Sequence, residues 1–152
     1  MAGAPEFDGT RIISESCVRR IGDVAEAVDA VEEAFCRYAA GEATMPPKSY
    51  VDLADVDGDF RSMPARVGDG AGVKWVNVHP DNPERFGLPT VMGLVVYSDP
   101  ESAYPLAVLD GTELTRLRTG AAAGVATRHL APADASTLGI VGAGEQDRKS
   151  VV

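Results

Sequence analysis

The sequence predicts an α/β fold, and three observations carry that prediction. Short apolar runs of four to nine residues, each bounded by turn-forming residues, are typical of strands. Between positions 24 and 38 the apolar residues instead recur every three or four positions, which is typical of a helix. The 152 residues, 45% of them apolar and 24% charged, are enough for one domain with a core.

Composition and charge exclude several classes of protein. Acidic residues outnumber basic ones 23 to 14, and the net charge of -9 argues against a nucleic-acid partner. The excess predicts a soluble acidic surface, and adaptation to high salt is an equally good interpretation. No apolar run approaches a membrane span and no secretory signal is visible. Two cysteines, Cys17 and Cys36, suit a reducing compartment, so we expect a cytoplasmic protein without a membrane partner.

The first third of the chain is expected to hold one strand and two helices. Residues 11–13 are a short strand, and Ser14 is expected to cap a brief helix that Gly22 ends. Asp23, with a glutamate three places on, is expected to cap a longer helix that stops at Gly41. One stripe of this helix is expected to be core: Val24, Ala27, Val28, Val31, Phe35 and Tyr38.

A hairpin is expected next, after a Pro-Pro pair that cannot be helical. Strands at residues 49–53 and 60–65 flank an acidic turn that contains Asp-Gly, a pair typical of hairpins. The turn is not a calcium loop, because Phe60 stands where the loop glycine belongs and Arg66 where the bidentate glutamate belongs. We therefore expect no metal site.

The central stretch, residues 72–99, holds one lysine inside an otherwise apolar strand. Residues 73–76 are Val-Lys-Trp-Val, a polar loop follows at 79–87, and the uncharged run 90–98 predicts a second strand. A lysine in so apolar a strand either extends to water or is held for chemistry. Its immediate surroundings leave both interpretations of Lys74 open.

The last helix is rich in small residues. After a strand at 105–109, Thr112 is expected to cap a helix that runs, with or without a break, to about Leu130. Glycines and alanines follow Arg118 and Thr119, and such residues let a backbone or a ligand come close.

A strand that runs into G-x-G is how a dinucleotide-binding unit begins. Residues 137–141 predict that strand, and Gly142 and Gly144 follow it. The first glycine makes a tight turn, and the second lets a pyrophosphate approach a helix N-terminus. Alone this signal is weak, because a third glycine and an acidic ribose ligand do not follow.

Five segments stand in a fixed order along the chain. They are MPPK at 45–48, RSMPA at 61–65, the stretch from KWVN at 74–77 to LPTVM at 88–92, LRTGAA at 117–122, and GAGEQ at 142–146. Together they resemble the ornithine cyclodeaminase/mu-crystallin family, most closely its archaeal alanine dehydrogenase branch. The resemblance covers about residues 10–146.

The resemblance implies a homodimer built by a substrate-binding and dimerisation domain with a mixed sheet, followed by an NAD(P)-binding Rossmann domain. Members oxidise a small L-amino acid to an imine with NAD or NADP. The implied boundaries are 1–131 for the substrate domain and 132–146 for the start of the Rossmann domain. Residues 147–152 depart from the family pattern and are expected to be a non-native tail. A fragment of this extent is expected to be inactive alone, marginally stable and prone to associate through strand edges.

Carried onto this sequence, the resemblance implies roles for individual residues. Lys74 takes the place of the catalytic lysine. Arg61 and Arg118, with Lys48, take the places that bind the substrate carboxylate, which arginine grips with a two-point fork. The positions near the cofactor are Thr90, Thr119, Gly142, Gly144 and Gln146. Simpler interpretations remain: Arg118 could neutralise acidic surface, and Arg61 could pair across the hairpin.

Two other functions stay open beside amino-acid oxidation. One is a non-catalytic protein that binds cofactor or a small ligand, as mu-crystallin-like members do, and the other is a ketimine reductase. The presence of Arg61, Lys74 and Arg118 together favours an enzyme. The residues do not fix the amino acid or the choice between NAD and NADP, and the family's acidic catalytic residue lies outside the matched segments.

Overall fold

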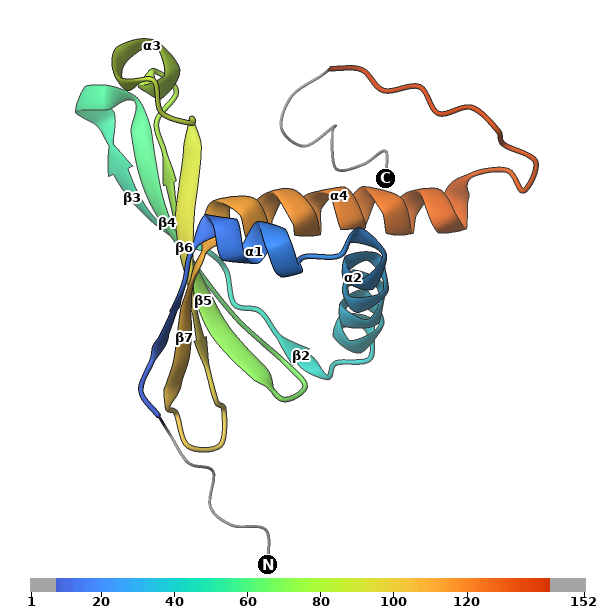
Figure 1. Cartoon of the computed structure of the whole chain (residues 1–152), viewed down its shortest axis with the longest axis horizontal. Coiled ribbons are helices and arrows are strands. Elements are labelled where there is room, and N and C mark those ends of the chain that lie inside the picture. Colours follow the sequence, from blue (N-terminus) through green and yellow to red (C-terminus); the bar gives the residue numbers. More distant parts are fainter. Residues whose placement is uncertain (1–7, 143–152) are drawn as a thin grey trace, which may run out of the picture.

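The computed structural model describes residues 8–142 and confirms the predicted α/β class with a mixed sheet. Figure 1 shows a twisted sheet with helices gathered on one side of it. The strands are β1 (Arg11–Ile13), β2 (Ala43–Thr44), β3 (Ser49–Leu53), β4 (Gly58–Val67), β5 (Gly70–Val78), β6 (Val91–Ser98) and β7 (Pro105–Asp110). The helices are α1 (Glu15–Ile21), α2 (Val24–Ala39), α3 (Asn82–Phe86) and α4 (Gly111–Leu130), with a 3-10 turn at Ala54–Val56.

The sheet has seven strands in the order β1-β7-β6-β5-β4-β2, and β3 also pairs with β4. All pairs are antiparallel except β1 with β7. In the register, Lys74 of β5 lies opposite Met63 of β4 and Val95 of β6. Residues that lie opposite each other share a face of the sheet, so this register decides which side chains surround Lys74.

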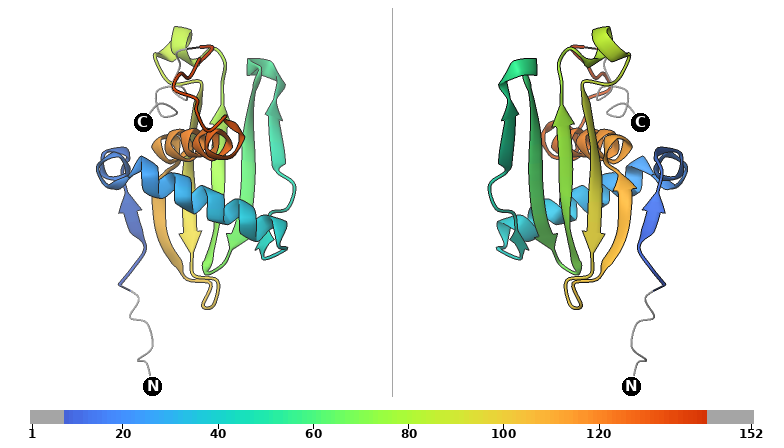
Figure 2. Two further views of the ribbon diagram at one scale, coloured as in Figure 1. Left: turned by 90° about the vertical axis from the view of Figure 1, so that its right-hand side faces the viewer. Right: turned by 90° about the vertical axis from the view of Figure 1, so that its left-hand side faces the viewer.

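The helical side of the molecule is built around α4. Its N-terminal end meets β5 and β6, the helix projects away from the sheet, and α2 packs against its side (Figures 1 and 2). The crossing is close because Gly124 has no side chain: a Cβ at that position would stand 3.0 Å from Cγ2 of Val28. The small residues predicted in this helix therefore admit another helix. Among the residues described, no helix is both long and apolar enough to cross a membrane.

The helix caps match the prediction at α2 and correct it at α4. The Asp23 side chain accepts a hydrogen bond from the Glu26 amide at 2.9 Å, as expected. At α4 the cap is Asp110, whose carboxylate accepts from the Glu113 amide at 2.8 Å. Thr112 lies inside the first turn instead, and its hydroxyl accepts from the Gly93 amide at 3.3 Å. The helix continues without a break to Leu130.

The expected core stripe of α2 is wrong at its C-terminal end. Phe35 and Tyr38 are each 54% exposed, and α2 has no fully buried residue. The reason is geometric, because α2 crosses α4 near Val28 and only part of the stripe reaches another element.

Three local predictions also need correction. The loop at 79–87 contains the short helix α3, which has a proline in its first turn and ends at Gly87 with φ +64°. Ser14 precedes α1 without a side-chain cap, since its hydroxyl contacts that of Ser16 at 3.1 Å. Residues 137–141 form no strand in this structure, and none of the strands within residues 8–142 pairs with them.

The face of the sheet away from α4 carries a group of apolar side chains that no helix of the described residues covers. By the register, Trp75 lies opposite Leu94 there, and Val51 lies opposite Phe60. Phe60 and Trp75 touch, with ring centroids 5.7 Å apart. We call this surface the open face; on it Ile12, Val51, Trp75 and Leu94 are 79%, 52%, 41% and 50% exposed.

Candidate functional site

A cavity of about 580 Å³ lies where the loop after α3 meets the start of α4. Its walls are residues 87–93 on one side and Gly111, Thr112, Thr115 and Arg116 on the other, with Val76 of β5 beneath. The walls are largely apolar and carry hydroxyl groups from Thr90, Thr112 and Thr115. An apolar pocket with a few convergent polar groups is the usual form of a small-molecule site.

Local contacts fix both walls of the cavity. The Thr90 carbonyl accepts a hydrogen bond from the His79 amide at 2.9 Å, and the buried Asn82 donates to the Pro89 carbonyl at 3.2 Å. On the other wall Gly111 lies directly against β6, since a Cβ there would come within 2.8 Å of Gly93 backbone atoms. Glycine at this position lets the N-terminus of α4 reach the sheet.

Lys74 lies beside this cavity, on the face of the sheet that α4 covers. Its Nζ donates a hydrogen bond to the Thr115 hydroxyl at 3.3 Å. The pKa of Lys74 is lowered from 10.5 to about 8, mainly by burial and in addition by the positive charges of Arg118 and Lys48. The lysine is therefore half-buried and bonded to α4, and it is not simply a strand-end lysine that faces solvent.

Arg118 and Lys48 are close enough to Lys74 to act on its charge, although both side chains are largely exposed. Arg118 comes from α4, three residues after Thr115, and Lys48 precedes β3. Residues from three separated segments thus gather positive charge at one place in a chain whose net charge is -9.

Arg61 lies on the same face of the sheet as Lys74, but its guanidinium is paired with the carboxylate of Asp59. It lies opposite Val76, two residues along β5 from Lys74, which is the diagonal relation of about 7–8 Å between backbones in an antiparallel pair. Its Nε and Nη2 donate to the two Asp59 oxygens at 2.5 and 2.8 Å, and its guanidinium carbon stands 5.5 Å from the centre of the Tyr50 ring. Arg61 holds the pKa of Asp59 below its ordinary value. Arg61 thus pairs within its own strand and stacks across the hairpin.

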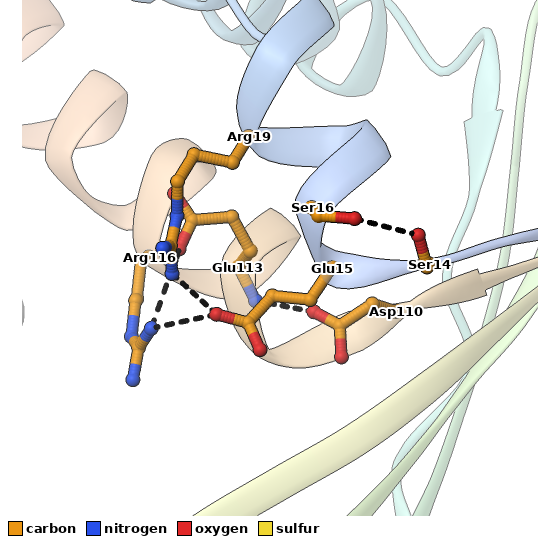
Figure 3. Close-up of polar contacts among 7 residues, drawn as sticks. All are labelled: Ser14, Glu15, Ser16, Arg19, Asp110, Glu113 and Arg116. Atoms are coloured by element: carbon orange, nitrogen blue, oxygen red, sulfur yellow. Dashed lines mark hydrogen bonds and ion pairs between the residues drawn. The ribbon is translucent and has the colours of Figure 1, made fainter.

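The start of α4 is fastened to α1 by an ion-pair network (Figure 3). Glu113 is only 3% exposed, and its carboxylate lies 3.3 Å from Arg116 and 3.7 Å from Arg19. Glu15 of α1 contacts Arg19 and lies 3.9 Å from Arg116. A buried carboxylate is tolerated only with such partners, so the network fixes the helix end that walls the cavity.

The structure describes three of the five predicted cofactor positions, namely Thr90, Thr119 and Gly142. Thr90 lines the cavity. The Thr119 hydroxyl is buried without a hydrogen-bond partner among the described residues, which leaves it ready for a ligand atom. Gly142 has φ +117°, a conformation that favours glycine and suits a tight turn. Gly144 and Gln146 lie outside the described residues.

Comparison with known proteins decides the family. The family model described as "Ornithine cyclodeaminase/mu-crystallin family" matches residues 10–151. The chain belongs to this family.

Members of the ornithine cyclodeaminase/mu-crystallin family that are similar to this chain include enzymes of several kinds. Alanine dehydrogenase from Archaeoglobus fulgidus is 49% identical over 137 residues, which are 90% of this chain and 42% of that protein. L-lysine cyclodeaminase from Streptomyces rapamycinicus is 36% identical over 147 residues, covering 90% of this chain and 43% of that protein. The chain thus spans about two fifths of the length of these relatives.

Solved structures of the family have the same fold over this part. An archaeal alanine dehydrogenase dimer with bound NAD is 48% identical with a TM-score of 0.88, over 93% of this chain and 43% of that one. The Thermococcus litoralis Δ1-pyrroline-2-carboxylate reductase, in complex with NADH and L-proline, is 35% identical with a TM-score of 0.87, over 93% and 44% of the two chains.

Three residues around the site were not predicted from the sequence. Thr115 and Arg116 line the cavity, and Asp59 binds Arg61. A signal for Thr115 was present, because a residue three places before Arg118 shares its side of a helix. Asp59 gave no comparable signal, since it stands among other acidic residues of a turn.

Proposed function

We propose that the protein carrying this chain is an NAD(P)-dependent oxidoreductase that oxidises a small L-amino acid to an imine, as an alanine dehydrogenase or an ornithine cyclodeaminase-like deaminase does. The observation that supports this most directly is Lys74, a half-buried amine beside a cavity with a pKa of about 8. Such an amine is neutral in about a tenth of the molecules at pH 7, against about one in three thousand for an ordinary lysine. It can therefore take a proton near neutral pH.

The charges around the cavity suit the carboxylate of an amino acid. Arg118 and Lys48 supply positive charge close to Lys74, and the N-terminus of α4, a 20-residue helix, forms one wall. Amide groups at a helix N-terminus favour an anion. Arg61 uses its Nε and Nη2 for Asp59, which leaves its Nη1 for a substrate oxygen.

In this proposal the neutral Lys74 accepts the proton that the substrate amine releases as the imine forms. The same lysine, now an ammonium, returns a proton while water attacks the imine carbon, so that a keto acid and ammonia leave. A bound nicotinamide would supply the acceptor for the hydride from the substrate Cα. Thr90, Thr119 and Gly142 are the described residues that would hold it, and the unpartnered hydroxyl of Thr119 supports that fit.

We also propose that the protein is a homodimer in which the open face of each subunit is buried in the interface. Apolar side chains such as Trp75 and Leu94 are half exposed there, and exposed apolar patches of this kind mark interfaces. The archaeal alanine dehydrogenase relative is itself a dimer.

The test uses the complete protein and follows nicotinamide absorbance with L-alanine or L-ornithine and NAD or NADP. Turnover that Lys74→Ala abolishes, with circular dichroism unchanged, is the expected result. Arg37→Ala, on α2 and paired with Glu33, is the control and should retain turnover. Cofactor binding without turnover of any amino or imino acid would instead support the mu-crystallin-like binding function.

A second candidate is reduction of a cyclic imine, the reverse direction at the same site. The relative that favours it is the Thermococcus litoralis reductase with its NADH and L-proline ligands. Rapid consumption of NADH with Δ1-pyrroline-2-carboxylate and slow oxidation of L-alanine would select this candidate.

A further inference from the structure

We propose that Thr115 is the positioning residue for Lys74, holding its amine at the edge of the cavity so that it meets a ligand bound there. This inference rests on the proposed function, because it concerns the same lysine. It goes beyond that function in naming a residue on α4 that sets where the amine stands.

The first argument is that Thr115 lies between the cavity and Lys74. Thr115 lines the cavity, whereas Lys74 approaches it from β5 through its hydrogen bond to the Thr115 hydroxyl. A lysine has four flexible side-chain bonds, and burying such a chain costs about 1.5–2 kcal/mol of conformational entropy. A hydroxyl at a fixed point on a helix reduces that freedom at the end of the chain where the chemistry occurs.

The second argument is that the sheet neighbours of Lys74 and the two nearby cations do not hold its amine in place. Along the sheet it lies between Met63 and Val95, which offer no hydrogen bond. The charged groups that act on it, Arg118 from α4 and Lys48 before β3, both repel an ammonium. The Thr115 oxygen can accept a hydrogen bond from the charged amine and donate one to the neutral amine, so it serves both protonation states.

The third argument is the rigidity of the element that carries Thr115. Asp110 caps the helix one turn earlier, and Glu113 is buried among arginine side chains (Figure 3). Gly111 lies directly against the backbone of β6. The first two turns of α4 are thus fixed to the sheet, which makes a hydroxyl on them a precise anchor.

The test measures the protonation of Lys74 without requiring turnover. The chain has three lysines, at positions 48, 74 and 149, so trace acetylation with acetic anhydride followed by peptide mass spectrometry resolves each one. Thr115→Val removes an acceptor for the ammonium, so the midpoint of the Lys74 labelling curve should fall by about one pH unit. Thr115→Ser keeps the hydroxyl and should restore the wild-type midpoint. Thr127→Val, an exposed position further along α4, is the matched control and should leave the curve unchanged.

In the complete protein, Thr115→Val should lower kcat by at least tenfold and shift the acid limb of the pH profile by the same amount as the labelling midpoint, whereas Thr115→Ser should retain both. An unchanged labelling midpoint in Thr115→Val would overturn the positioning role and leave the proposed function standing. A shifted midpoint in a protein that turns over no amino or imino acid would reject the proposed function and retain the positioning role.

Discussion

Replacing Lys74 by methionine should make the protein more stable at neutral pH while removing its activity. The pKa of Lys74 is lowered from 10.5 to about 8, so the folded state disfavours the charged amine. A full shift of that size corresponds to about 3 kcal/mol. Because the side chain still reaches water, screening reduces the effect, and we expect a gain of about 1–2 kcal/mol. Methionine fills a similar volume without a charge.

The sign of this effect depends on pH in a defined way. Above 10.5 the amine is neutral in both the folded and the unfolded chain, so the substitution should bring no electrostatic gain. As pH falls from 10.5 to about 8, the unfolded chain binds a proton and the folded chain does not, so wild-type stability decreases. Below about 8 the difference is constant, and the gain from Lys74→Met should be complete.

The measurement is urea unfolding followed by the fluorescence of Trp75, the neighbour of Lys74 and the only tryptophan in the chain, at pH 7 and above pH 10.5. Lys48→Met is the control, because that lysine is exposed, and its gain should be smaller. A Lys74→Met variant that is less stable than wild type at pH 7, or whose gain is the same at both pH values, would refute the reasoning.

Two further substitutions test the fold around the site, and a third tests association through the open face. Gly111→Ala should lower the free energy of unfolding by about 1–3 kcal/mol, because its Cβ would meet the β6 backbone at 2.8 Å, while Gly139→Ala, with nothing within 4 Å, should be neutral in the same thermal melt. Glu113→Ala should cost about 2 kcal/mol in urea unfolding, because it leaves two guanidiniums without their buried partner. Leu94→Glu should reduce self-association in analytical ultracentrifugation, whereas Leu130→Glu, at the far end of α4, should not.

Strands and helix starts were predictable where local chemistry decides them. The strand at Ser49–Leu53 has the predicted bounds, and the Asp23 cap forms as predicted. The α4 cap was misplaced by two residues because Thr112 and Asp110 are both good cap residues, and the contact of Gly111 with β6 sets the register. The α3 helix has only five residues, too few for periodicity to show.

For the site, the sequence predicted some residues but not the contacts that they make. Lys74 and Arg118 were predicted as site residues from an ordered set of motifs, and in the structure the charge of Arg118 acts on Lys74, while their roles stay predictions. The Asp59–Arg61 pair and the bond to Thr115 were not predicted, because they depend on which side chains the sheet register and the helix position place side by side. The bond between Lys74 and Thr115 joins segments 41 residues apart and follows from tertiary packing, whereas Asp59 and Arg61 lie two residues apart in one strand, where several acidic residues offered themselves as partners.

The arrangement of charge in the molecule makes a structural role for the Lys74 cluster a poor explanation. Elsewhere cations meet acids: Arg128 binds Asp29 at 2.9 Å, and Arg37 binds Glu33 at 2.6 Å. Lys74 instead lies where burial and its charged neighbours both weaken its ammonium form, in a chain with an excess of 9 negative charges. Sites that break the local rules of stability in this way are expected where function requires it. A bound carboxylate would relieve the repulsion among these cations, so a ligand that carries a carboxylate, such as an amino acid, should stabilise the fold most strongly below pH 8, where Lys74 is charged.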